Sequence, residues 1–323
     1  MAASKKTGGL AGVTAGKTEL CTVGQEGAGL TYRGYDIYDL VDHASFEEVA
    51  YLLLHGKLPT RAELDAYIAR LVTLRGLPDD LKTVLEMIPA DTHPMDVQRT
   101  GVSFLGNIEP EGDFANQADT ADRLLACLPS ILLYWHRFHT DGTRIDTTTD
   151  DDSVAGHFLH MLHDKPPSEL HRKCLDTTLI LYAEHEFNAS TFAGRVITGT
   201  LSDMHSAVTG AIGALRGPLH GGANEAAMEL IQQYDNADDA TKGIHEKLAN
   251  KDLIMGFGHR VYTTSDPRNS VNKRMSKALA EEKGDMTLYE VSEAIEKVMW
   301  DEKNLFANAD FFAASVYHFM GIP

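Results

Sequence analysis

Segments with helix start and stop signals follow one another along most of this 323-residue chain. Ser45 with Glu48, and Thr60 with Glu63, have the spacing of capping boxes, in which side chain and backbone satisfy each other at a helix N-terminus. Strand signals are almost absent after Gly34. This succession restricts the chain to the all-α class, with enough helices for two packed bodies.

Apolar residues at helical spacing predict where the other helices lie. They are expected near residues 95–105, 120–138, 153–163, 167–186, 190–199, 203–215, 223–234, 238–249, 268–283, 287–302 and 310–320. Residues 18–34 combine short β-rich runs with a glycine-containing turn, which predicts a short N-terminal β-hairpin.

Charge and cysteine content exclude several classes of function. The net charge is −18, which disfavours nonspecific binding to nucleic acid or to an anionic membrane surface. The sequence has no run of about 18 apolar residues, and its N-terminus has no apolar signal region, so neither a membrane span nor secretion is expected. Three distant cysteines, Cys21, Cys127 and Cys174, form no metal-type pair and indicate a reducing, cytoplasmic compartment.

The first segment that indicates chemistry is SAVTGAIGALRGPLHGGAN, residues 206–224. A helix of small residues is expected to end at Gly217-Pro218, and a new helix to begin after Gly221-Gly222. His220 lies in the turn between them, before a helix N-terminus whose dipole disfavours a protonated imidazole. A neutral imidazole there could donate a hydrogen bond to a developing oxyanion; the alternative is an ordinary connector with His220 facing solvent.

The second segment is LIMGFGHRVYTTSDPR, residues 253–268. Gly256 and Gly258 would let the backbone approach a ligand closely, and His259 follows directly. Residues 251–274 contain five basic residues and two aspartates, which gives a local net charge of +3. A phosphate-bearing ligand would require such a local excess of positive charge. An ordinary interhelix loop is the alternative.

Two further segments contain polar side chains in apolar surroundings. In FANADFF, Asp310 begins an apolar helix and is either an N-cap or a carboxylate made more basic by burial. In AEHEFNAST, His185 and Asn188 are expected to share a helix face, where a purely structural role is the alternative. A metal site is not expected, because His157, His160 and His163 point around the helix in different directions.

Taken together, GPLHGGANE, MGFGHRVY…SDPR, NADFF and EHEFNAST resemble the citrate synthase family over essentially the whole chain. Within that family, ELCTVGQEGAGLTYRGYDIYDL, LLYWHRFH and DDDSVAGHFLHMLH look like the bacterial 2-methylcitrate synthases. The resemblance implies a homodimer of two-domain, all-α subunits that condense propionyl-CoA, and often acetyl-CoA, with oxaloacetate. It requires no metal and no redox cofactor, since the coenzyme A thioester is itself the substrate.

The resemblance also implies a role for individual residues. The catalytic residues would be His220 at the thioester carbonyl, Asp310 as the base that removes the α-proton, and His259 at the oxaloacetate carbonyl. Oxaloacetate would be bound by His185, Asn188 and Arg268. Coenzyme A would be bound by Leu253, Ile254, Met255, Gly256, Phe257, Gly258 and Lys303.

The domain organisation follows from the same resemblance. Residues 1–221 would form the large domain and residues 222–323 the small domain. Relatives continue beyond the helix of Asp310 with a segment that returns to the large domain and brings further arginines. The sequence ends at Pro323, so part of that cationic clamp is expected to be missing. Two alternatives remain open: a citrate synthase that prefers acetyl-CoA, and a non-catalytic helical scaffold that retains the fold.

Overall fold

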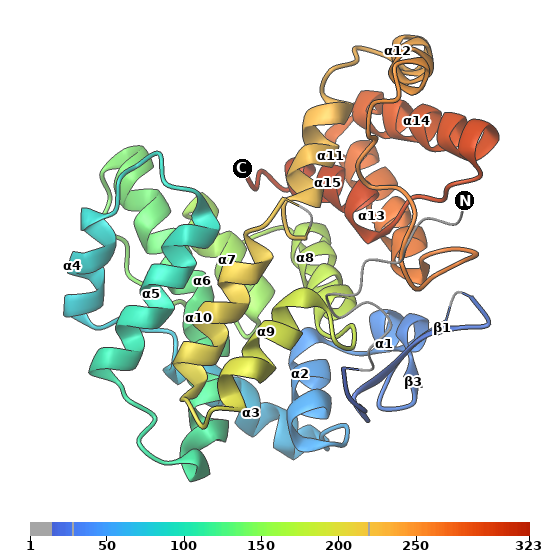
Figure 1. The fold of residues 1–323 in the computed structure, drawn as a ribbon. Helices are drawn as coiled ribbons and strands as arrows, with labels where there is room; N and C mark the ends of the chain where they lie inside the picture. Colours follow the sequence, from blue (N-terminus) through green and yellow to red (C-terminus); the bar gives the residue numbers. More distant parts are fainter. Residues whose placement is uncertain (1–14, 28, 219) are drawn as a thin grey trace, which may run out of the picture.

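The computed structural model describes residues 15–27, 29–218 and 220–323, which form fifteen α-helices and one small sheet (Figure 1). The sheet consists of β1 (Cys21–Gln25), β2 (Gly29–Tyr32) and β3 (Tyr35–Asp36). The first ten helices are α1 (Ile37–His43), α2 (Phe46–His55), α3 (Arg61–Thr73), α4 (Asp79–Met87), α5 (Pro94–Ile108), α6 (Gln117–Asp141), α7 (Val154–His163), α8 (Glu169–Tyr182), α9 (Ala189–Thr198) and α10 (Met204–Leu215). The last five are α11 (Ala223–Ile231), α12 (Ala237–Ala249), α13 (Pro267–Lys283), α14 (Thr287–Lys303) and α15 (Ala309–Phe319).

The predicted start signals begin helices as expected. Both capping boxes are formed: Ser45 caps α2 with Glu48, and Thr60 caps α3 with Glu63. The N-terminal hairpin is also present, and β3 extends it to a three-stranded antiparallel sheet. Two short helices, α1 and α4, were not predicted, because each is too short to show a clear helical period.

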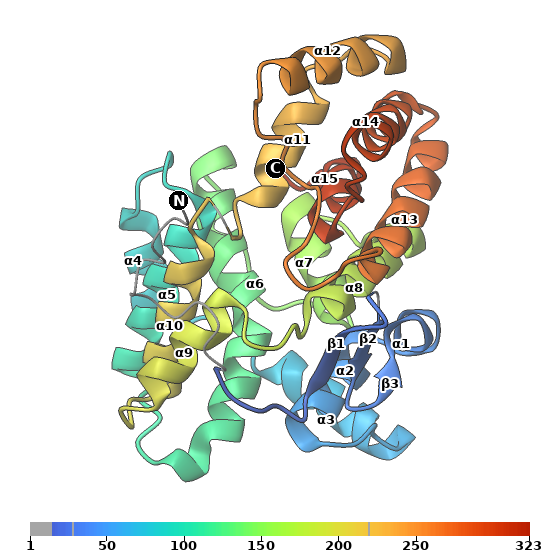
Figure 2. The same cartoon turned by 45° about the vertical axis from the view of Figure 1, so that its right-hand side comes forward.

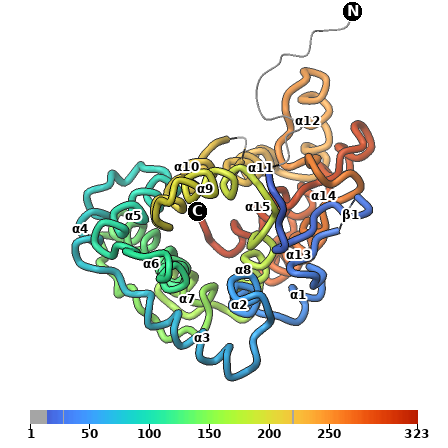
Figure 3. Tube along the Cα trace, turned by 60° about the horizontal axis from the view of Figure 1, so that its bottom comes forward, coloured from blue at the N-terminus to red at the C-terminus, as the bar shows by residue number. Residues whose placement is uncertain are grey.

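The helices form two bodies that lie side by side (Figures 1 and 2). One apolar core lies within α11–α15 and the segments that join them. Two further cores lie among the sheet, the first three helices and α7–α8, and among α4–α6. Val271 and Val316, on α13 and α15, join the core around α8, so these two helices contact both bodies (Figure 3). A domain boundary near residue 221 remains a prediction.

One predicted helix is shorter than expected. The helix predicted over residues 167–186 ends at Tyr182, and Glu186 has a left-handed φ of 55°. A left-handed non-glycine residue cannot continue a right-handed helix. His185 and Asn188 therefore lie on the loop between α8 and α9, and the prediction that they share a helix face was wrong. Among the described residues, no helix is long and apolar enough to cross a membrane.

Candidate active site

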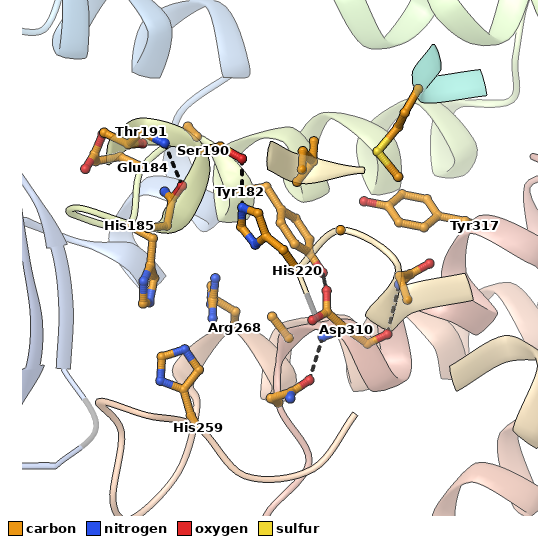
Figure 4. A pocket seen from close by; sticks show the side chains of 18 residues that line it. Tyr182, Glu184, His185, Ser190, Thr191, His220, His259, Arg268, Asp310 and Tyr317 are labelled. Carbon is orange, nitrogen blue, oxygen red and sulfur yellow. Dashed lines mark hydrogen bonds between the residues drawn. The ribbon is translucent and has the colours of Figure 1, made fainter. Parts of the chain in front are cut away.

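The six side chains predicted to bind oxaloacetate or to catalyse the reaction all line one cavity of about 550 Å³ between the two bodies (Figure 4). They are His185, Asn188, His220, His259, Arg268 and Asp310. They come from the α8–α9 loop, the α10–α11 turn, the loop before α13, and the first turns of α13 and α15. In Figure 4, His185 and His259 lie on one side of Arg268, while Tyr182 and Tyr317 lie on the side of Asp310.

Asp310 lies in the first turn of α15 but is not its cap. The cap is Asn308, whose Oδ1 accepts a hydrogen bond from the backbone N–H of Asp310 at 3.1 Å. The carboxylate is thereby left for the cavity, where Tyr182 donates its hydroxyl proton to Oδ1 at 3.0 Å. Burial raises the pKa of Asp310 above the ordinary carboxyl range, and the Tyr182 hydrogen bond opposes that rise. The alternative interpretation of Asp310 as the N-cap of this helix is therefore wrong.

His220 lies in the predicted turn between α10 and α11. Its backbone N–H donates to the carbonyl oxygen of Gly217 at 2.9 Å, which closes the turn. Its Nε2 is 2.7 Å from the hydroxyl oxygen of Ser190, in the first turn of α9. The ring is thus fixed by its own turn and by a side chain thirty residues earlier.

His185 and His259 face each other with ring centroids 5.2 Å apart. Nδ1 of His259 accepts hydrogen bonds from the backbone N–H groups of Val261, at 3.0 Å, and Tyr262, at 3.2 Å. A neutral His259 must therefore have its proton on Nε2. Nε2 of His185 is 3.0 Å from the Tyr262 hydroxyl oxygen.

Both imidazoles are held in the neutral form. Burial lowers the pKa of His185 to about 3, with the nearby charge of Arg268 as the second cause. Burial also lowers the pKa of His259, with Arg268 as the second cause. Two neutral rings beside a permanent guanidinium charge can donate or accept single hydrogen bonds without repelling it.

Arg268 supplies a fixed positive charge to the cavity. Its Nε and Nη2 donate to the two carboxylate oxygens of Asp266 at 2.9 and 2.8 Å, a bidentate pair. The two residues are only 7% and 3% exposed. Asp266 also accepts the backbone N–H of Ala309 at 3.0 Å, next to Asp310. Nη1 of Arg268 has no acceptor among the described residues.

The side chain of Asn188 is partly committed to the fold. It caps α9, and its Oδ1 accepts the backbone N–H of Thr191 at 3.0 Å. Its Nδ2 group remains as the donor that can face a ligand. Asn188 therefore both begins the helix and lines the cavity.

Four side chains that contact the side chains of the predicted site residues were not assigned to the site from the sequence: Tyr182, Ser190, Tyr262 and Asp266. Asp266 carried a signal, since an Asp-Pro-Arg sequence at a helix start places the cap and the arginine two residues apart. The other three contact their histidine or aspartate partners across 30 to 128 residues of sequence, so spacing alone could not identify them.

The residues predicted to bind coenzyme A do not line this cavity. Leu253 is 77% exposed, whereas Ile254 is buried in the core of α11–α15. Gly256 has a φ of 88°, and a Cβ there would lie 2.9 Å from Phe311, so the close approach expected of this glycine is toward α15. Lys303 ends α14 on the surface. Their role remains a prediction.

Carboxylates compensate most of the local positive charge in residues 251–274, and this compensation was not predicted from the sequence. Arg268 pairs with Asp266, Lys273 with Glu293 and Glu296, and Arg274 with Asp42. A count along the sequence misses these partners because several of them are distant in the chain. Lys251 and Arg260 are the basic residues of the segment for which no carboxylate partner is present among the described residues.

The three histidines of α7 have separate partners. His157 lies between the hydroxyls of Ser130 and Thr149, and His163 contacts the carbonyl oxygen of Met320 at 2.8 Å. His160 contacts Asp151 at 2.7 Å and lies close to Asp150. The rings do not converge on one point, in agreement with their predicted directions.

Comparison with known proteins identifies the class to which this fold and site belong. A family model described as citrate synthase, C-terminal domain, matches residues 9–323. The chain belongs to the citrate synthase family, whose members are acyltransferases of the citrate synthase and 2-methylcitrate synthase type. The resemblance read from the sequence and the all-α fold class are both confirmed.

Individual relatives with known names are similar to this chain over nearly its full length. A 2-methylcitrate synthase of Shewanella oneidensis is 63% identical over 99% of this chain and 86% of its own length. A citrate synthase of Haloferax volcanii is 42% identical over 98% of this chain and 85% of its own. Citrate synthase of Thermoplasma acidophilum, solved as a ternary complex with carboxymethyl coenzyme A and oxaloacetate, superposes with a TM-score of 0.90 at 31% identity, covering 97% of this chain and 84% of that one.

Proposed function

We propose that this protein condenses propionyl-CoA with oxaloacetate and hydrolyses the product to 2-methylcitrate and free coenzyme A. The observation that carries the proposal is the meeting of Asp310, His220, His259 and Arg268 around one cavity. The 63% identical 2-methylcitrate synthase supports the choice of propionyl-CoA. The experiment is a coenzyme A release assay with oxaloacetate and each of the two thioesters, and absence of release with both would overturn the proposal.

In the first step, the Asp310 carboxylate removes a proton from the carbon next to the thioester carbonyl. Such a carbon is a very weak acid, so charge on the carbonyl oxygen must be stabilised as the proton leaves. We assign Ser190 as the donor to Nε2 of His220, which leaves the His220 proton on Nδ1 as the donor to the carbonyl oxygen. The raised pKa of Asp310 makes its carboxylate a stronger base than an exposed one.

In the second step, the enol carbon attacks the ketone carbon of oxaloacetate. Nε2–H of His259 donates to the ketone oxygen and passes its proton there as the new carbon–carbon bond forms. The proton that Asp310 took up then returns the ring to its neutral form, which regenerates the carboxylate. Arg268 pairs with a substrate carboxylate through Nη1, and His185 and Asn188 add neutral donors. The Asp266 carboxylate holds the guanidinium in place before the substrate arrives.

In the third step, water hydrolyses the thioester of the condensed product, giving 2-methylcitrate and coenzyme A. Water must be excluded until condensation is complete, because otherwise the acyl-CoA itself would be hydrolysed. A cavity between two bodies can meet that requirement by closing on oxaloacetate. Coenzyme A is proposed to lie along residues 253–258 and Lys303.

A second candidate, citrate formation from acetyl-CoA, is favoured by a specific relative. A citrate/2-methylcitrate synthase of Bacillus subtilis, 39% identical over 98% of this chain, has both names. The two acyl groups differ by one methylene, which a pocket distinguishes by about 1–3 kcal/mol. The ratio of kcat/KM for propionyl-CoA and acetyl-CoA decides between the two, and a ratio below one would favour citrate synthase.

We also propose that the protein is a homodimer through α9 and α10. None of the residues of α9 is buried, although the helix has a clear apolar side. Val196 is 55% exposed, and Leu201, after the helix, is 78% exposed. Gly210 of α10 packs against Ile197 of α9 in the same chain, so the two helices would meet a second copy as one packed pair. Sedimentation at micromolar concentration tests this assignment, and a monomer would contradict it.

A further inference from the structure

The N-terminal β1–β2 hairpin contacts both loops that carry the facing histidines. Its strands pair antiparallel, with Cys21 opposite Tyr32 at one end and Gln25 opposite Gly29 at the other. The first end lies against the α8–α9 loop, which carries His185. The second lies against residues 261–264, which follow His259.

At the first end, the fully buried Tyr32 holds the last turn of α8 and the start of the loop. Its hydroxyl proton is shared between the carbonyl oxygens of Ile180, at 2.9 Å, and Leu181, at 3.2 Å. The same oxygen accepts the backbone N–H of Glu184 at 3.4 Å. The hydroxyl therefore fixes the backbone immediately before His185.

Cys21, opposite Tyr32, holds the residues on either side of His185. Its sulfur accepts the backbone N–H of Glu186 at 3.2 Å and donates to the Glu184 carboxylate at 3.4 Å. The thiol is buried, and its pKa is raised by that burial, with the Glu184 charge as the second cause. It therefore remains a protonated donor. Strands β1 and β2 thus each provide one side chain to the loop.

At the second end, the backbone of the turn holds the segment after His259. The carbonyl oxygen of Gly27 accepts the N–H groups of Thr263, at 2.9 Å, and Thr264, at 3.1 Å. Gly27 has a φ of 87°, and a Cβ there would lie 2.6 Å from both threonine hydroxyls. A side chain at this position would therefore push the segment away.

These contacts connect the hairpin with both histidines, which also contact each other through Tyr262. The 261–264 segment provides the two N–H groups that bind Nδ1 of His259, and the Tyr262 hydroxyl that contacts His185. We propose that the hairpin sets the separation of the two histidines, with Tyr32 and the Gly27 carbonyl as positioning groups at its two ends. This inference rests on the proposed function only where it concerns oxaloacetate.

The first test needs no substrate. Hydrogen exchange of the ligand-free protein is measured by mass spectrometry in Tyr32→Phe and in the wild type. Losing the hydroxyl leaves the Glu184 N–H without its partner, so exchange should accelerate in residues 183–188. Because the hairpin connects the two loops, exchange should also accelerate in residues 261–264. Acceleration confined to residues 183–188 would overturn the proposal.

Gly27→Ala tests the same connection from the other end and remains informative should Tyr32→Phe not fold. We expect faster exchange in residues 183–188 although the substitution lies against residues 261–264. Thr22→Val is the control, because it removes a hydroxyl contact with Thr31 on the exposed face of the same hairpin. The control should leave both segments unchanged.

The second test uses the enzyme reaction. Tyr32→Phe and Gly27→Ala should each raise KM for oxaloacetate by about tenfold, a typical result of losing one fixed hydrogen bond, with KM for the thioester within about twofold. A substitution that only destabilised the fold would lower Tm but would not raise KM for oxaloacetate while leaving KM for the thioester unchanged. Unchanged KM for oxaloacetate in both variants would overturn the proposal, whereas an inactive wild type would count against the proposed function alone.

Discussion

The two ends of the cavity are built differently. One end, formed by His185, His259 and Arg268, is the end that the proposed function assigns to oxaloacetate and is called the keto-acid end. Its polar atoms have several fixed partners, and two loops and a buried carboxylate hold them. The other end, formed by His220 and Asp310, is the end that the proposed function assigns to the thioester and is called the thioester end. Each of its two side chains has one hydroxyl partner, from Ser190 and Tyr182 respectively.

Under the proposed function, this difference corresponds to two tasks, binding an anionic substrate and transferring a proton. A site that binds a dianion gains most from charges already oriented before binding, because no reorganisation is then needed. A base must exchange a proton during each turnover, so its environment has to tolerate both the charged and the neutral form. One adjustable hydroxyl partner suits Asp310, while the bidentate Asp266 contact suits Arg268.

The largest expected effect comes from removing the base at the thioester end. Asp310→Asn should reduce kcat by about 10³-fold or more, because an amide cannot accept the α-proton. Binding of oxaloacetate, measured by calorimetry, should remain near the wild-type value, since Asp310 lies outside the keto-acid end. Unchanged turnover would rule out this base. Asp301→Asn, in an exposed pair with Lys297, is the control.

The next largest effect concerns the keto-acid end. Arg268→Lys should raise KM for oxaloacetate by about 10²-fold, because a lysine cannot pair with Asp266 in bidentate fashion and also reach the substrate. The kcat value at saturation should change less. Arg274→Lys is the matched control on the same helix, in an exposed pair with Asp42. Equal KM values for the two variants would remove Arg268 from the binding site.

A smaller effect is expected from the hydroxyl that orients His220. Ser190→Ala should lower kcat by about tenfold, because His220 then loses the hydroxyl contact that holds its ring and that is proposed to keep its proton on Nδ1. KM for oxaloacetate should stay constant, which separates this end of the cavity from the other. Ser292→Ala, on α14 and outside the cavity, is the control. A change in KM with kcat intact would contradict the assignment.

The smallest effect is a change in pH dependence. The Tyr182 hydrogen bond favours ionised Asp310, so Tyr182→Phe should raise the pKa of that carboxyl further. Because the base must be ionised, the acid limb of the kcat profile should move to higher pH. Tyr134→Phe is the matched control, since Tyr134 makes the same kind of contact with Glu86 far from the cavity. A limb that moves to lower pH would contradict the assigned contact.

The acid limb should not come from His185. Its pKa is lowered to about 3, so this ring stays neutral throughout the usual assay range. Protonation of His185 therefore does not change activity until the pH falls toward that value. It does affect stability at higher pH, because below about pH 6.5 the unfolded imidazole takes up a proton and the folded one does not, so stability falls as the pH drops from about 6.5 toward 3.

Local signals in the sequence predicted the elements well where they were strong. The capping boxes at Ser45 and Thr60 began helices as expected, because a cap depends on residues three apart. The turn at Gly217-Pro218 and the helix after Gly222 were also placed correctly. The end of α8 was not, because the left-handed backbone at Glu186 follows from contacts with β1 rather than from its own residue type.

The sequence by itself determined the helical class, the N-terminal hairpin, and which histidines and aspartate line the cavity. The tertiary structure decided which partner each of them has: Tyr182 for Asp310, Ser190 for His220, and Tyr262 for His185. The reason is physical. Caps and turns depend on neighbours within a few residues, whereas proton positions and pKa values depend on burial and charges that only the folded chain brings together.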